Sequence, residues 1–94
     1  MMAPPFDLDV ADVPRPTTVA DFPLALAALE RVLAEGEARH RGAWRRQTVQ
    51  EHVQHALRHL HAYEAGDVGD DHLAHALTRC AMATQLAAAS RRTT

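Results

Sequence analysis

The 94-residue sequence contains one cysteine, no lysine and few aromatic residues, which make up 4% of the chain. The single cysteine, Cys80, excludes an internal disulfide and favours a reducing compartment. No apolar run approaches the ~18 residues of a membrane helix, and no basic segment leads into an apolar stretch as in a secretory signal. We therefore expect a cytoplasmic protein without a membrane span, in one small domain.

Alanine is the residue in excess, with 19 of the 94 positions. Alanine favours helix and adds little bulk, so the sequence predicts helices that approach closely around a thin core. A chain of this kind gains stability by burying a face against a second copy of itself. We therefore expect a homo-oligomer of helical subunits.

The basic residues are concentrated in the middle of the chain. The net charge of −2 argues against nucleic-acid binding. All ten basic residues are arginine, and half of them lie in the segment 39–58, where Glu51 is the only acid. Four of these arginines surround Trp44; guanidinium groups bind phosphate oxygens in pairs, and an indole can stack on a base. In the alternative interpretation, Trp44 closes the end of a helix bundle and the arginines are solvated.

The distribution of proline divides the chain into three parts. Four of the five prolines precede position 17, where no helical period occurs. We predict an extended arm over residues 1–20, a single helical domain over 21–90 and a tail over 91–94.

Three helices with short connections are predicted in the helical domain. Asp21 is a candidate N-cap for the first helix, and Thr48 with Glu51 forms a capping box for the second. Gly66 suits the position after the end of the second helix, and an aspartate at position 70 or 71 caps the third. Their expected bounds are 21–39, 48–65 and 71–89.

Apolar residues at helical spacing predict which faces form the core. The expected stripes are Phe22, Leu26, Leu29 and Leu33; Val49, Val53, Ala56 and Leu60; and Leu73, Ala76, Leu77, Cys80 and Thr84. Because no β pattern and no internal repeat occurs, the predicted fold class is all-α, a small three-helix bundle completed by oligomerisation.

Seven histidines in a chain of this length are the most unusual feature of its composition. Two antiparallel helices joined by a short turn would bring His59 and His61 near His72 and His75. Three interpretations stay open: a metal site, phosphate recognition or proton transfer by His59 and Arg58, and a structural role at a helix border.

Carboxylates spaced ExxE and ExxD on successive helices hold Mg²⁺ in helical nucleotide pyrophosphohydrolases, because oxygens at i and i+3 converge on one cation. This sequence has Gln54 three residues after Glu51, and Ala74 three residues after Asp71. The full set of four carboxylates is therefore missing.

Six short segments follow one another along the chain: Gly36-Glu-Ala-Arg39-His40, Trp44, Ala56-Leu-Arg58-His59-Leu60, Tyr63, Gly66-Asp67 and His72-Leu-Ala-His75-Ala76. Their order resembles the small phage and bacterial dATP/dGTP diphosphohydrolase family, the MazZ-like proteins. The resemblance covers residues 24–86. Two positions depart from the family pattern, because His40 stands where tyrosine is usual and Ala43 where asparagine precedes the tryptophan.

The resemblance implies a MazG-related helical fold that hydrolyses a purine (deoxy)nucleoside triphosphate to the monophosphate and pyrophosphate with Mg²⁺ or Mn²⁺. Under this hypothesis, His59 and His75 are catalytic, and Glu51, Asp67 and Asp71 hold the metal. The substrate-binding residues are Arg39, Trp44, Arg45, Arg46, Arg58 and His72. The alternative is a non-catalytic helical module that binds a nucleotide or a protein, for example as a phage accessory or counter-defence factor.

Overall fold

The computed structural model describes residues 15–92 and consists of helices. The three main helices are α1 (Pro23–His40), α2 (Val49–Glu64) and α3 (His72–Arg92). Short 3₁₀ helices, η2 (Val19–Asp21) and η3 (Ala43–Arg46), precede α1 and α2. No strand occurs within 15–92, which confirms the all-α prediction. Most of the expected arm falls on residues 1–14, outside the described residues.

The helix ends follow local chemistry, with two differences from expectation. Thr48 Oγ1 accepts a hydrogen bond from the Glu51 amide at 3.0 Å, and Glu51 Oε1 accepts one from the Thr48 amide at 2.8 Å, which confirms the capping box. Asp21 caps no α-helix: it lies in η2, where it binds Arg15, and α1 begins at Pro23. The third helix continues through Arg92, so the first two residues of the expected tail, 91–94, are helical.

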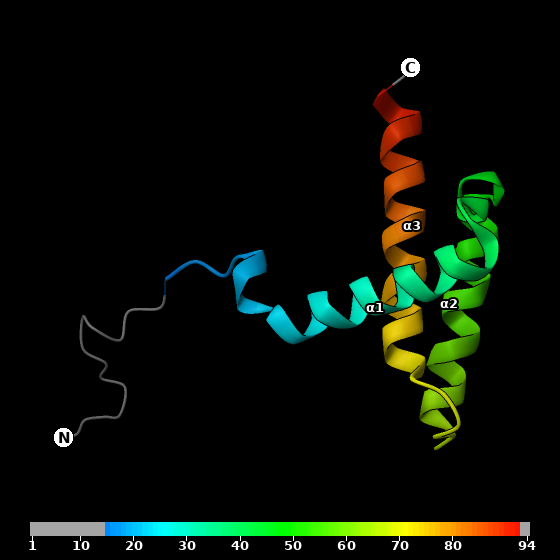
Figure 1. The fold of residues 1–94 in the computed structure, drawn as a ribbon. Helices are drawn as coiled ribbons and strands as arrows, with labels where there is room; N and C mark the ends of the chain where they lie inside the picture. Colours follow the sequence, from blue (N-terminus) through cyan, green and yellow to red (C-terminus); the bar gives the residue numbers. More distant parts are fainter. Residues whose placement is uncertain (1–14, 93–94) are drawn as a thin grey trace.

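Helices α2 and α3 run antiparallel and lie side by side, and α1 crosses α3 at a steep angle (Figure 1). Gly66 has a φ of 84°, a left-handed conformation that lets the chain leave α2 and turn back into α3. Gly42, with a φ of 67°, makes the corresponding bend between α1 and η3. These two turns bring the end of α1 and the start of α2 against the middle of α3.

The core is formed mainly by small residues, and Ala56 and Ala76 are the members of the predicted apolar stripes that are buried. Buried apolar side chains within 15–92 are Val32, Ala56, Ala74, Ala76 and Ala83, and the buried polar ones are His52, His72 and Thr78. The stripe prediction is wrong for most of the large residues: Leu26, Leu33, Val53, Leu60, Leu73 and Leu77 are 36–48% exposed. Alanine lets the helix backbones approach closely, which leaves the larger side chains at the margins of the contact.

The exposed leucines and valines give the single chain an apolar surface. The composition suggests that a second copy of the chain covers this surface, and that oligomer stays a prediction. No helix in the described part of the chain is both long and apolar enough to cross a membrane.

Candidate functional site

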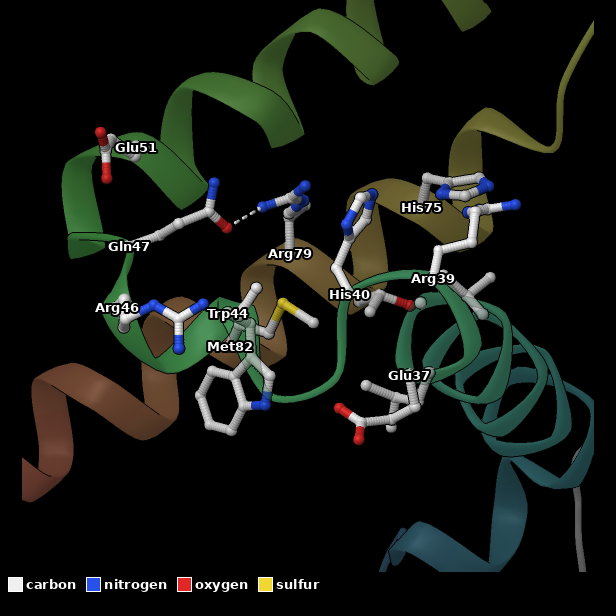
Figure 2. A pocket seen from close by; sticks show the side chains of 15 residues that line it. Glu37, Arg39, His40, Trp44, Arg46, Gln47, Glu51, His75, Arg79 and Met82 are labelled. Carbon is white, nitrogen blue, oxygen red and sulfur yellow. Dashed lines mark hydrogen bonds between the residues drawn. The ribbon is translucent and has the colours of Figure 1, made fainter.

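A cavity of about 540 Å³ lies where α1, η3, the start of α2 and the middle of α3 meet (Figure 2). Cavities of 300–1,000 Å³ are typical of small-molecule sites. We call this cavity the pocket. Its lining residues are Val32, Leu33, Gly36, Glu37, Arg39, His40, Ala43, Trp44, Arg46, Gln47, Glu51, His75, Thr78, Arg79 and Met82.

Three arginines reach the pocket from three different elements. Arg39 comes from the last turn of α1, Arg46 from η3 and Arg79 from α3. Arg39 and Arg46 are two of the four arginines expected to bind substrate. The other two do not line the pocket: the Arg45 guanidinium lies over the Trp44 ring, 5.0 Å from its centroid, and Arg58 lies 3.3 Å from His55 Nδ1.

Arg79 was not expected from the sequence, and it is the best-anchored of the three pocket arginines. Its Nη1 donates to Gln47 Oε1 at 2.8 Å, a contact drawn in Figure 2, and to His52 Nδ1 at 3.0 Å. Burial, followed by the charge of Arg58, lowers the pKa of Arg79. Its position four residues after His75 places the two side chains on one helix face, a signal that the sequence does contain.

His52 connects Arg79 to Trp44. The His52 side chain is fully buried, and its Nε2 donates to the Trp44 carbonyl oxygen at 3.0 Å. Because a guanidinium can only donate, Nδ1 must accept from Arg79, and the imidazole is the neutral tautomer with its proton on Nε2. One buried ring therefore holds both a phosphate-binding candidate and the backbone of the only tryptophan.

Trp44 is half-buried and lines the pocket, so it serves the bundle and the cavity at once. Its ring centroid lies 6.5 Å from that of His52, and the two rings are tilted by 57°. Stacking of Trp44 on a base stays a prediction.

The three acids expected to hold a metal do not come together in one chain. Glu51 lies in the first turn of α2, whereas Asp67 follows the other end of this 16-residue helix, about 24 Å away at 1.5 Å per residue. Asp71 Oδ2 accepts from Arg31 at 2.8 Å. Glu51 lines the pocket, where the second acid is Glu37, whose Oε2 accepts from the Gly42 amide at 2.9 Å.

A second group of titratable side chains lies at the turn between α2 and α3. We call His59, His72, His75, Asp67 and Asp70 the histidine cluster. The sequence-based prediction that His59 would meet His72 and His75 is confirmed, whereas no contact joins His61 to them among the described interactions. The His59 and His72 Nδ1 atoms are 2.9 Å apart, and the His59 and His75 rings stack with centroids 4.9 Å apart.

Each aspartate of the histidine cluster is paired with one histidine. Asp67 Oδ2 lies 3.1 Å from His72 Nε2, and Asp70 Oδ1 lies 3.3 Å from His75 Nε2. His75 also lines the pocket, so it connects the cluster to the cavity. Among the residues assigned to catalysis, only His75 therefore reaches the pocket directly.

The electrostatic environment lowers several pKa values in the histidine cluster. Burial lowers the pKa of His59, and the neighbouring His75 and His72 lower it further. The Gly69 amide lowers the pKa of Asp67, with a smaller effect from His72, and the Asp71 amide lowers the pKa of Asp70. Both carboxylates are therefore ionised at neutral pH beside a His59 ring that resists protonation.

Comparison with protein families gives one match. The family described as "dATP/dGTP diphosphohydrolase, N-terminal" matches residues 8–94. The chain belongs to this family. No curated protein and no solved structure matches the chain.

Membership in the dATP/dGTP diphosphohydrolase N-terminal family indicates a nucleotide as substrate. Apart from Arg58, which lies against His55, the positions that resemble the family pattern fall into two places in the structure. Arg39 and Trp44 line the pocket, whereas His59, Asp67 and His72 belong to the histidine cluster, and His75 belongs to both. The two departures, His40 and Ala43, also line the pocket.

Proposed function

We propose that the pocket binds a purine (deoxy)nucleoside triphosphate and that the protein hydrolyses it to the monophosphate and pyrophosphate. The observation that carries this proposal is the convergence of three arginines, from three elements, on a cavity that also contains the only indole of the chain. The family supports a nucleotide as the ligand.

The arginines suit a polyphosphate chain because of their placement. A guanidinium offers a planar pair of N–H donors that matches two phosphate oxygens, and each hydrogen bond to a charged group contributes about 1.5–3 kcal/mol. Arg79 is already oriented by Gln47 and His52, so little side-chain entropy is lost when it binds. Arg39 and Arg46 approach from the other elements and would bind the remaining phosphate oxygens.

Trp44 suits the base. Stacking of a nucleobase on an aromatic ring contributes about 1–3 kcal/mol and tolerates different bases. His40 and Ala43, which replace the family's usual tyrosine and asparagine, change the polar groups beside that ring. We therefore expect base and sugar preference in this protein to depend on these two positions.

A magnesium or manganese ion would enter the pocket together with the triphosphate. Mg²⁺ commonly binds through one or two carboxylates together with substrate phosphates, and Glu37 and Glu51 are the two carboxylates that line the cavity. One of these carboxylates would hold the ion together with the substrate phosphates, and the ion would neutralise charge on the phosphates and polarise the phosphoryl group that is attacked. Asp67 and Asp71 lie outside the pocket and have no part in this binding mode.

His75 is the residue best placed to move a proton at the pocket. It reaches the cavity from α3, and its Nε2 faces Asp70 Oδ1 at 3.3 Å, which fixes the orientation of the ring. The other ring nitrogen, Nδ1, would orient the attacking water or accept its proton. His59 stacks against His75 and acts as a positioning residue for that ring.

A pyrophosphate-release assay over the common NTPs and dNTPs, with Mg²⁺, Mn²⁺ or EDTA, tests the proposal. We expect release from purine deoxynucleotides that requires the metal and is lost in His75→Ala. Arg41→Ala is the matched control, because Arg41 is exposed and does not line the pocket.

A protein that binds the nucleotides but releases no pyrophosphate would be a non-catalytic binding module. Two carboxylates at the pocket, rather than four, favour this second candidate. A protein that neither binds nor hydrolyses any nucleotide would contradict both candidates.

A further inference from the structure

The contact between His59 and His72, at the turn between α2 and α3, requires a positively charged occupant between the two rings. Their Nδ1 atoms are 2.9 Å apart. Two nitrogen lone pairs repel one another at this distance, so either a proton or a cation must lie between them. The identity of the occupant depends on which nitrogens already carry protons.

Asp67 settles the protonation of His72. The Asp67 carboxylate can only accept, and its Oδ2 lies 3.1 Å from His72 Nε2, so Nε2 carries a proton and the neutral ring offers the lone pair of Nδ1 as a ligand. A carboxylate that binds the far nitrogen of an imidazole is the arrangement that orients histidine ligands in metal sites and makes them more basic. The ring is also held in place, because His72 is only 9% exposed.

A third ligand atom lies close by. One atom each from His59, Asp70 and His72 lie within 4.8 Å of one another. His59 is half-buried in α2, His72 is buried in α3 and Asp70 is exposed on the turn between these helices.

We propose that His59 Nδ1, His72 Nδ1 and an Asp70 carboxylate oxygen bind a zinc-class divalent cation, with Asp67 as the positioning residue for His72. Zn²⁺ binds histidine nitrogen at about 2.0–2.1 Å, so two nitrogens of a tetrahedral site are about 3.3 Å apart. The two rings therefore need to separate by only a few tenths of an ångström, and Asp70 would supply the third ligand through a carboxylate oxygen.

The donor set selects the class of ion. Two imidazoles and one carboxylate suit Zn²⁺, Co²⁺ or Ni²⁺, whereas Mg²⁺ requires oxygen ligands in near-octahedral geometry. Three protein ligands leave one position of a tetrahedral ion for water. This site is separate from the Glu37 and Glu51 carboxylates at the pocket, and the inference does not depend on nucleotide hydrolysis.

Binding of the ion would join the C-terminal end of α2 to the N-terminal end of α3. His59 belongs to α2 and His72 to α3, with the glycine-containing turn between them. A ligand that binds only the folded chain stabilises it by mass action, so zinc should raise the melting temperature.

The experiment uses the full chain without an affinity tag, treated with a chelator and then titrated with Co²⁺ and Zn²⁺. We expect one Co²⁺ per chain with the visible absorption of a tetrahedral ion, displacement by Zn²⁺, and no displacement by millimolar Mg²⁺. His59→Gln should abolish the absorption, and Asp67→Asn should weaken binding by about 10–100-fold. His61→Ala is the control, because His61 is exposed two residues further along α2 and should leave binding unchanged.

Circular dichroism of each variant separates loss of the site from loss of the fold. Co²⁺ binding that is absent, that persists in a folded His59→Gln variant, or that falls equally in His61→Ala would overturn the proposal. Because pyrophosphate release and metal absorption are separate measurements, a chain that hydrolyses nucleotides without binding Co²⁺ would contradict this inference alone.

Discussion

Replacement of His52 by alanine tests the connection between the pocket and the core. His52 is the largest fully buried side chain of the described residues and bridges the Trp44 carbonyl and Arg79. His52→Ala removes two hydrogen bonds of about 1 kcal/mol each, leaves the Trp44 carbonyl without its donor and opens a cavity. Together these effects should lower the free energy of unfolding by about 3 kcal/mol. For a domain of this size that is a fall of roughly 12–24 °C in melting temperature.

Urea denaturation followed by circular dichroism measures this loss. His61→Ala is the control and should change stability by less than about 0.5 kcal/mol, because His61 is exposed. His52→Gln keeps a donor and an acceptor, so its free energy of unfolding should lie between those of His52→Ala and His61→Ala. The emission of Trp44 should also shift to longer wavelength in His52→Ala. A loss below about 1 kcal/mol would refute the bridging role that the structure gives to His52.

Three further predictions follow from the pocket, the pKa values and the turns. Arg39→Ala should weaken nucleotide affinity about tenfold, the loss expected for one charge-assisted hydrogen bond. Arg41→Ala should leave the affinity unchanged, and calorimetry measures both. Equal losses of affinity in the two variants would contradict the assignment of the pocket. Burial, then Arg79 and Arg58, lower the pKa of His55 below its ordinary 6.5. Because the unfolded chain then binds the proton more tightly, stability should fall as pH decreases through 6.5, and His55→Gln should flatten that dependence in urea titrations in EDTA. An unchanged pH dependence in His55→Gln would count against the lowered pKa of His55. Gly66→Ala should destabilise the protein by about 1 kcal/mol, because Gly66 has a φ of 84°. Gly36→Ala lies inside α1 with open space around the added carbon, so it should stabilise the protein by a similar amount. Thermal melts in which both variants shift the melting temperature in the same direction would be inconsistent with these backbone conformations.

Local signals predicted the helices well because they depend on neighbouring residues. The Thr48–Glu51 capping box and Gly66 marked the two ends of α2, and both are found in the structure. The meeting of His59 with His72 and His75 also followed from local information, since a short turn forces α2 and α3 to be antiparallel. The fold class required nothing beyond these signals.

The pocket could not be predicted in the same way, because it depends on how α1 crosses α3. Nothing near Arg79 in the sequence indicates that Gln47 and His52 will bind it. The stripe prediction failed for the large residues for a related reason: the helices approach along alanines, of which Ala56 and Ala76 were in the expected stripes and Ala74 and Ala83 were not. The separation of Glu51 from Asp67, by contrast, was already implied by the sequence, because the two acids stand at opposite ends of the helix expected over 48–65.

The most direct test of the central claim is a fluorescence titration of the wild-type protein with dGTP and Mg²⁺. Trp44 is the only tryptophan in the chain and lines the pocket, so its emission reports on that cavity alone. We predict saturable quenching as the base stacks on the indole, with the midpoint displaced to higher nucleotide concentration in Arg39→Ala. Emission that does not change up to millimolar dGTP would contradict the assignment of the pocket as a nucleotide site.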